Sequence, residues 1–515
     1  MNSKIPKTLV IGWDGAPYNK IREWIDKRDL KVLSSLVNKG SFGPLKTTPL
    51  TISSCAWTTM VTGKNAGKHG IYDFFGNDFV NDSYFRMPIN SKARKSKALW
   101  HYLSEYGIKI GVVNVPMTYP VEKINGFMIG GMMSPSVNSP GFTYPPDLLK
   151  DYPYLKDYRI DIERAKHMDR EKFIQEIFKT MEERTRLFKY LMKKIKVDVF
   201  FGVYTCPDRF SHYLWHFFDD EHPHRKIESQ SEIDKYKDSL LEVYRVLDDY
   251  LGELIDYFGA ENVVVLSDHG FESVYKYFEF NKWLEQKGYL EFKPKDKWDK
   301  FSHEKLNPKR IYIYGKVNWK RTLAYMIGKR GTVYINLEGR EPQGIVKKEE
   351  YHDLVQDLIK DIKTIVDPDI NKKIVKDVLP RDKIFFGPYL HLAPDIITFF
   401  EDHYASIGYI VNLNSEELFI ENSNPELELE MGIERGSGIV IFSGDYYIKS
   451  NIEGASLEDI TPTLLYQYGI RIPQDMDGKI LKVLDTSKIN FLKPKVNVLL
   501  TDKERKVISQ LKKNI

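Results

Sequence analysis

Short runs of apolar, often β-branched residues recur along the chain and end at polar residues or glycines. Such runs are typical of buried strands in a sheet that is covered on both faces. We predict strands at residues 8–12, 108–114, 198–204, 262–267, 395–399 and 438–442. Because segments with helical periodicity separate these strands, the pattern predicts an α/β fold with a mostly parallel central sheet flanked by helices.

The clearest helical pattern covers residues 232–258, where apolar side chains recur at steps of three and four. This stripe predicts one amphipathic helix that covers a face of the sheet, and Gly259 predicts its end. A second helix with the same spacing is predicted at residues 351–366.

Residues 275–331 differ from the rest of the chain, since they are rich in lysine and aromatic residues and only weakly periodic. We interpret residues 275–384 as an insertion or cap, and residues 1–274 together with 385–484 as the catalytic core. Residues 485–515 form a Lys-rich C-terminal tail with a short helical pattern around Val507 and Leu511. We expect this tail to be solvated.

Composition narrows the class of protein. With 42% hydrophobic and 29% charged residues over 515 positions, the chain matches an ordinary globular protein. A formal net charge of +4 is too small to indicate a nucleic-acid polymer or a membrane surface as partner. Cys55 and Cys206 are the only cysteines, which excludes a disulfide framework and a Cys-rich zinc site. Without a signal-like or membrane-spanning apolar segment, we expect a cytoplasmic protein with no membrane insertion.

Polar residues that can bind metals follow three of the predicted strands. They are Asp14 after the first strand, Asp208 and His212 after the third, and Asp268 and His269 after the fourth. The carboxyl ends of parallel strands meet at one edge of a sheet, so we expect these side chains to converge. Carboxylates together with imidazoles suit zinc, manganese or iron better than calcium.

Asp208 and His212 are four residues apart, so a helical turn places both on one face, where they can bind one ion. A helix-capping Asp beside a half-buried His is the alternative interpretation of this pair. Asp268 and His269 are adjacent, and they can converge because Gly270 permits a sharp turn.

Residues 48–70 contain many hydroxyl side chains just before a helix-like stretch at residues 56–61. Ser53 or Ser54 would cap this helix, where backbone N–H groups and the helix dipole suit a phosphoryl anion. A plain capping serine is the alternative, and Cys55 is interpreted as a buried apolar residue.

Seven sequence blocks occur together in a fixed order. They are GWDG at 12–15, TGKNAGKHGIYDF at 62–74, NVPMTYP at 114–120, PDRFSH at 207–212, LSDHGF at 266–271, NLEGREPQGIV at 336–346, and DITPTLLYQYGI followed by DMDG near the end. This order resembles the alkaline phosphatase superfamily, and within it the branch of type I phosphodiesterases and nucleotide pyrophosphatases, especially its prokaryotic phosphohydrolase and phosphomutase-like members. The resemblance implies an alkaline-phosphatase-like fold and a centre of two divalent metal ions.

The resemblance also implies roles for individual residues. Asp14, Asp268 and His269 correspond to the ligands of one ion, and Asp208 and His212 to ligands of the other. An ungapped count back from residues 61–63 puts Ser53 at the nucleophile's position, where it also binds the first ion. Ser54 is the rival, because a shift of one residue would exchange the two serines.

The sequence departs from the family pattern at two positions. Glu434, in GIERGSG, stands where the family has the last His ligand of the second ion. A carboxylate there favours harder ions, so we expect Zn²⁺ or Mn²⁺, with Mg²⁺ as a further option. The alternatives are that this position has lost its role or that His403 substitutes for it. Phe74 replaces an Asn that holds a phosphoryl oxygen in nucleotide pyrophosphatases.

Other residues would therefore have to contact the substrate's phosphoryl oxygens. Lys64 and Asn65 are candidates from the hydroxyl-rich segment, and Arg340 is a third, although a structural salt bridge fits Arg340 equally well. A sulfatase is disfavoured, because Cys55 is followed by Ala-Trp-Thr-Thr and not by the x-Pro-x-Arg that a sulfatase requires.

The resemblance implies a metal-dependent phosphoric ester hydrolase that acts on a small phosphorylated substrate. We expect a phosphodiesterase or nucleotide-pyrophosphatase type of enzyme with a phosphoseryl intermediate at Ser53. The alternatives are a phosphomutase or phosphomonoesterase, and a binding protein of the same fold that is catalytically impaired. The sequence gives no indication of the oligomeric state.

Overall fold

The structure is a computed structural model that describes residues 5–79, 84, 86–162, 168–298, 312–313, 315–411 and 415–494. The tail helix predicted around Val507 and Leu511 lies outside these residues. Among the described residues, no helix combines the length and the apolar character needed to cross a membrane.

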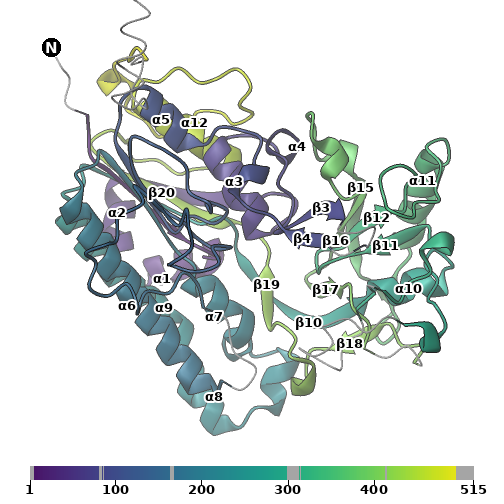
Figure 1. Cartoon of the computed structure of the whole chain (residues 1–515). Helices are drawn as coiled ribbons and strands as arrows, with labels where there is room; N and C mark the ends of the chain where they lie inside the picture. Colours follow the sequence, from purple (N-terminus) through teal and green to yellow (C-terminus); the bar gives the residue numbers. More distant parts are fainter. Residues whose placement is uncertain are drawn as a thin grey trace, which may run out of the picture.

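A nine-stranded sheet forms the centre of the molecule (Figure 1), in the order β21-β2-β20-β9-β1-β8-β5-β6-β7. The five middle strands, β9-β1-β8-β5-β6, run parallel, whereas β20 is antiparallel to both of its neighbours. The predicted mostly parallel central sheet is thus confirmed. The nine strands are β1 (Thr8–Trp13), β2 (Ser41–Lys46), β5 (Ile110–Val113), β6 (Gly126–Ile129), β7 (Thr143–Tyr144), β8 (Val199–Tyr204), β9 (Asn262–Leu266), β20 (Gly438–Gly444) and β21 (Ala455–Ser456).

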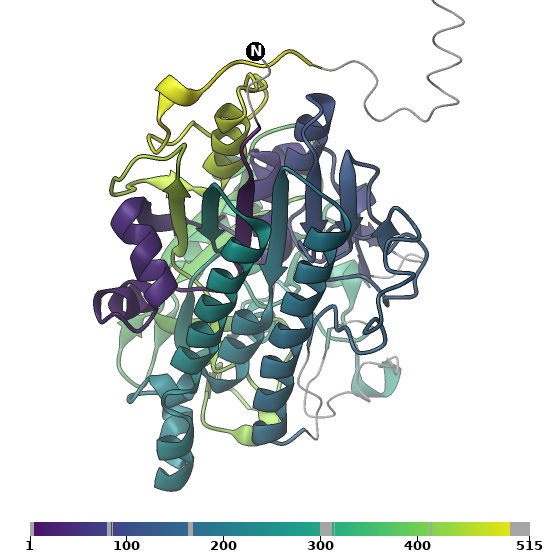
Figure 2. The same cartoon turned by 90° about the vertical axis from the view of Figure 1, so that its left-hand side faces the viewer.

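Helices cover both faces of this sheet. One layer contains α1 (Tyr18–Asp26), α2 (Lys31–Lys39), α6 (Arg170–Lys194), α7 (Cys206–Leu214) and α9 (Ser239–Phe258), and the other contains α3 (Ser53–Thr62), α5 (Leu99–Glu105) and α12 (Ile460–Gln467). The long helices α6 and α9 lie side by side (Figure 2). Because side chains alternate along a strand, Leu9 and Ile11 of β1 pack in the first layer and Val10 packs in the second.

The single helix predicted at residues 232–258 is two helices, α8 (Gln230–Tyr236) and α9. Lys237 and Asp238 interrupt it, but both keep right-handed helical backbone angles. The apolar steps therefore stay in phase across the break, which is why periodicity alone does not reveal it. Gly259 ends α9 with φ 65°, as predicted.

A second, smaller body lies beside the central sheet (Figure 1) and has its own apolar core. One of its sheets is antiparallel, in the order β11 (Ala324–Met326), β12 (Thr332–Ile335), β16 (Ile396–Phe400), β15 (Val375–Pro380). In the other, β10 (Phe271–Glu279) pairs with β17 (His403–Ile407), β18 (Phe419–Glu421) and β19 (Gly432–Glu434). The remaining α-helices and strands of the described residues are α4 (Ala66–His69), α10 (Phe280–Gln286), α11 (Tyr351–Ile362), β3 (Phe75–Phe79), β4 (Arg86–Pro88), β13 (Val366–Asp367) and β14 (Lys372–Lys373).

Two predictions in this region need correction. The strand predicted at residues 395–399 corresponds to β16, which pairs antiparallel with β12 and β15 and does not join the central sheet. An isolated apolar run predicts burial, but it does not specify the partner strand. The helix predicted at residues 351–366 ends earlier, since α11 stops at Ile362 and β13 begins at Val366.

Candidate metal centre

Three neighbouring parallel strands bring the predicted polar residues to one edge of the sheet. Asp14 follows β1, Asp208 lies in α7 after β8, and Asp268 and His269 follow β9. His269 Nε2 lies 3.2 Å from Asp268 Oδ2 and 3.6 Å from Asp14 Oδ1. Asp14, Asp208, Asp268 and His269 are all buried, so the structure gathers the predicted cluster away from bulk solvent.

Ser53 is the first residue of α3, and its side chain faces this cluster. Its Oγ lies 3.3 Å from His269 Nε2 and 3.5 Å from Asp14 Oδ1. The predicted capping role is wrong for both serines, because the N-cap residue is Ile52 and no side chain caps the helix. Within the described residues, Ser54 Oγ is buried without a hydrogen-bond partner. The geometry therefore brings Ser53, and not its rival, to the cluster.

A second group of ligand-type side chains lies next to the first. Helix α7 places Asp208 and His212 one turn apart, with 3.4 Å between Asp208 Oδ1 and His212 Nε2. Strand β19 ends at Glu434, whose Oε1 lies 3.6 Å from His212 Nε2. The alternative residue, His403, is exposed and stacks on Tyr275 with 4.0 Å between ring centroids. Of the two replacements considered for the family histidine, the structure brings Glu434 to His212.

The two histidines are oriented by backbone carbonyl groups. His212 Nδ1 lies 3.1 Å from the Gly432 oxygen, and His269 Nδ1 lies 3.0 Å from the Gly270 oxygen. A carbonyl accepts only from an N–H, so with Nδ1–H donating to the carbonyl each ring turns Nε2 toward the neighbouring carboxylates. This carbonyl contact is the usual support of a metal-binding histidine, and it directs Nε2 to the side on which an ion would lie.

Unsatisfied acceptor atoms point to the same conclusion. Asp208 Oδ1, Asp268 Oδ2 and Glu434 Oε2 are buried and have no hydrogen-bond partner among the described residues. In this cluster, two sets of ligand atoms lie close enough to hold an ion, namely Asp14, Asp208 and His269, and Asp208, His212 and Glu434. Within each set the atoms are within 4.8 Å of one another. The donor types and spacing of both sets fit divalent cations, and Asp268 lies beside His269 of the first set.

The carboxylates of the first group resist ionisation in the absence of ions. Burial, together with Asp268 and Asp208, raises the pKa of Asp14 well above its usual value. Burial, together with Asp208, raises the pKa of Asp268 to about 6. Close buried carboxylates repel one another, and a bound cation relieves this repulsion.

The carboxylates of the second group are stabilised as anions. Burial opposes ionisation of Glu434, but Arg330 and His212 outweigh it and hold the pKa of this carboxyl well below its usual value. For Asp208, burial is likewise outweighed by His212 and Arg209, so the pKa is lowered. The second group therefore contains its own positive charges.

Three residues that support the centre were not predicted. Arg330 pairs with Glu434, Arg209 Nη1 lies 3.6 Å from Asp208 Oδ2, and Trp57 Nε1 donates to Asp14 Oδ2 over 2.9 Å. Trp57 lies four residues after Ser53 on α3, so helical spacing would have indicated it. Arg330 comes from the weakly periodic region, where no sequence signal predicts its approach to Glu434.

The three predicted substrate contacts do not join the cluster. Lys64 and Asn65 follow the far end of α3, where Lys64 pairs with Asp475 and the Asn65 side chain accepts from Gly67 and Phe386. A ten-residue helix spans about 15 Å, which separates both from Ser53. Arg340 binds Asp395 through both terminal nitrogens, at 2.8 and 2.5 Å. It therefore forms the structural salt bridge considered as its alternative.

Fold and site together define a phosphoric ester hydrolase of the alkaline-phosphatase-like type. The sequence model of the family "Type I phosphodiesterase / nucleotide pyrophosphatase" matches residues 8–418, and the chain belongs to this family. No curated protein matches the sequence significantly.

Solved structures of low sequence identity are similar to this chain. Phosphonoacetate hydrolase from Sinorhizobium meliloti 1021, in complex with phosphonoacetate, has a TM-score of 0.53 at 13% identity, over 89% of this chain and 94% of that chain. Human ectonucleotide pyrophosphatase / phosphodiesterase 5 has a TM-score of 0.49 at 13% identity, over 92% of this chain and 100% of that chain. The likeness to the hydrolase supports the fold.

Proposed function

We propose that this protein is a metal-dependent phosphodiesterase that acts through a phosphoseryl intermediate at Ser53. The observation that carries the proposal is the position of Ser53 Oγ, 3.3 Å from His269 Nε2 and 3.5 Å from Asp14 Oδ1 at a buried cluster of carboxylates. A free serine is a weak nucleophile, and this is a setting in which it can be activated.

Two sets of residues would hold the ions. Asp14, Asp268 and His269 would hold one beside Ser53, and Asp208, His212 and Glu434 would hold the other. Divalent ions bound there would supply the positive charge that lowers the pKa of the serine hydroxyl and stabilises a leaving oxygen.

The chain's own groups perform the remaining tasks. Ser53 Oγ attacks phosphorus, the bond to the leaving alcohol breaks, and water later cleaves the phosphoseryl ester. The carbonyl of Gly270 holds the His269 ring so that Nε2 faces Ser53. The first intrahelical bond of α3 starts at the Ala56 N–H, so the N–H groups of Ser53, Ser54 and Cys55 remain available to a phosphoryl oxygen.

Glu434 makes us expect a centre that is less selective for zinc than one completed by histidine. A carboxylate adds negative charge and favours harder ions, so Mn²⁺ should support activity at least as well as Zn²⁺, and Mg²⁺ is a third candidate. The proposed substrate is a small phosphorylated molecule.

Paired chromogenic esters test the proposal. We expect the protein loaded with Mn²⁺ or Zn²⁺ to hydrolyse bis-p-nitrophenyl phosphate faster than p-nitrophenyl phosphate, and Ser53→Ala to remove both activities. A strong preference for the monoester would overturn the diesterase assignment in favour of a phosphomonoesterase or phosphomutase. A protein that binds no transition metal at this centre and turns over neither ester would be a binding protein of the same fold.

A further inference from the structure

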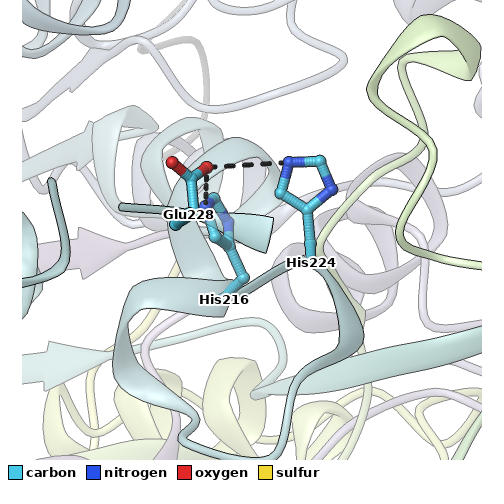
Figure 3. A group of neighbouring side chains, drawn as sticks. All are labelled: His216, His224 and Glu228. Carbon is cyan, nitrogen blue, oxygen red and sulfur yellow. Dashed lines mark hydrogen bonds and ion pairs between the residues drawn. The ribbon is translucent and has the colours of Figure 1, made fainter. Parts of the chain in front are cut away.

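A second cluster of metal-binding side chains lies outside the candidate centre, in the segment that follows α7. His216 belongs to the short helix η2 (Trp215–Phe218), His224 belongs to η3 (Pro223–Ile227), and Glu228 directly follows η3. Figure 3 shows both imidazole rings turned toward the same carboxylate oxygen of Glu228. None of these three residues belongs to the sets that would hold the catalytic ions.

The distances within this cluster match a tetrahedral ion site. His216 Nε2 lies 3.2 Å and His224 Nε2 lies 3.7 Å from Glu228 Oε1, and all three ligand atoms are within 4.8 Å of one another. Zinc bonds to nitrogen and oxygen of about 2.0–2.1 Å in a tetrahedron separate neighbouring ligand atoms by about 3.3–3.5 Å. The two distances to Glu228 are therefore close to those of an ion site, and the separation of the two imidazole nitrogens, within 4.8 Å, is the one that an ion would shorten most.

The position is buried, and it retains limited solvent access. His216 is 1% exposed, and the side chains of His224 and Glu228 are 9% and 11% exposed. An ion can thus reach the cluster from one side, where water would complete its coordination. Two neutral imidazoles and one carboxylate form a donor set that suits a transition-metal ion and not calcium or magnesium.

Arg170 is the group that most opposes a cation here, and its charge is already balanced. Its Nη2 lies 2.7 Å from Glu228 Oε1, and its Nη1 pairs with Glu232 as well as with Glu228. One guanidinium between two carboxylates leaves a local charge of about −1. Glu228 Oε1 is also approached by two imidazoles in addition to Arg170, which exceeds the two lone pairs of one oxygen.

We propose that His216, His224 and Glu228 bind a divalent transition-metal ion, zinc by preference, at a structural site separate from the catalytic centre. The proposal is independent of the proposed function. Its alternative is a metal-free network in which His216 Nε2–H donates to Glu228.

The position of the site indicates what the ion would do. The backbone N–H of His224 donates to His222 Nδ1 over 3.1 Å, and His222 Nε2 lies 3.0 Å from the Met431 oxygen. The Met431 N–H in turn donates to the oxygen of His212 over 2.7 Å. An ion at this site would therefore fasten the segment 216–228 against α7 and the approach to β19, two elements that carry the ligands His212 and Glu434.

The site can be tested by comparing the metal content of the full-length wild type with that of variants. We expect His224→Gln to contain one zinc ion fewer per chain than the wild type, while His352→Gln, an exposed histidine on α11, contains the same amount as the wild type. Equal zinc content in wild type and His224→Gln would overturn the proposal. The difference in zinc content between wild type and His224→Gln does not depend on whether the catalytic centre binds ions. It can therefore still be measured if the proposed function is wrong.

A second variant keeps the test decisive if His224→Gln folds poorly. In the cobalt-loaded protein, His224→Cys should show a thiolate-to-cobalt charge-transfer absorption that the wild type lacks, because the new sulfur would replace an imidazole at the ion. The same substitution at His352 is the control and should give no such band. Absence of the band from folded, cobalt-loaded His224→Cys would contradict the site.

Discussion

The two halves of the candidate centre balance buried charge in different ways. In the half nearest Ser53, no lysine or arginine of the described residues forms an ion pair with Asp14 or Asp268, and both carboxyls have raised pKa values. In the other half, Arg209 approaches Asp208 and Arg330 pairs with Glu434, and both carboxyls have lowered pKa values. The described residues thus give the second half cationic partners from lysine or arginine, and they give the first half none.

This difference bears on how strongly each ion is held. The first half has the ligand types that the family resemblance implies, and the repulsion between its carboxylates favours ion binding. In the second half, Glu434 stands where the family resemblance implies a histidine, and Arg330 pairs with this carboxylate. We therefore expect the ion beside Ser53 to be held more tightly than the ion at Glu434.

The largest expected effect on catalysis comes from removing the proposed nucleophile. Ser53→Ala should lower kcat by on the order of 10³-fold or more, because no other hydroxyl of the described residues contacts both His269 Nε2 and Asp14 Oδ1. Ser54→Ala is the matched control and should retain most of the activity, since its Oγ has no hydrogen-bond partner among the described residues. Steady-state rates on the chromogenic diester measure both. The reverse ranking of the two variants would move the nucleophile to Ser54.

In the absence of ions, replacing a carboxylate by an amide should change the free energy of unfolding in opposite directions in the two halves of the centre. Asp268 has a folded pKa of about 6 against an ordinary value of 3.8. Its contribution to stability is therefore complete below pH 3.8 and is lost as the pH rises through 6. In chelator at pH 7.5, Asp268→Asn should thus raise the free energy of unfolding, by about 1–3 kcal/mol.

Glu434→Gln should have the opposite effect in the same chelated protein. Removing the Glu434 carboxylate leaves Arg330 without its partner in a position where the guanidinium is only 18% exposed. Breaking such a pair costs about 3 kcal/mol. Urea unfolding at pH 7.5 with chelator measures both variants, and shifts of the same sign would refute the contrast between the halves.

A smaller effect is expected from removing the hydrogen bond that Trp57 donates to Asp14. Trp57→Phe removes the Nε1–H that donates to Asp14 Oδ2, and it should weaken ion binding or activity by about 10–100-fold. Trp100→Phe is the matched control, because Trp100 donates to Glu122 over the same 2.9 Å away from the centre. Metal titrations of the two variants give the comparison. Equal ion affinity in both would mean that the Trp57 contact does not orient Asp14.

The smallest effect concerns metal preference. Glu434→His should lower the ratio of activity with Mn²⁺ to activity with Zn²⁺, by up to about tenfold, because imidazole is the softer ligand. Glu421→His, on the exposed end of β18, adds a histidine elsewhere and should leave the ratio unchanged. An unchanged ratio in Glu434→His would indicate that position 434 takes no part in ion binding.

Much of the site could be predicted from sequence because its residues lie where buried strands end. Asp14, Asp268 and His269 follow apolar runs directly, and Asp208 and His212 are related by helical spacing. Arg330 could not be predicted, since its approach to Glu434 depends on how the smaller body packs against the central sheet. The antiparallel placement of β16 has the same cause, because strand pairing is a long-range property.

Acid-quenched turnover with the chromogenic diester tests the central claim most directly. If Ser53 is the nucleophile of a binuclear centre, peptide mapping by mass spectrometry will find a p-nitrophenyl phosphate group esterified to Ser53 in the metal-loaded protein and none after chelation. Turnover of the diester with phosphate on another residue, or with no phosphorylated peptide at any quench time, would contradict the account.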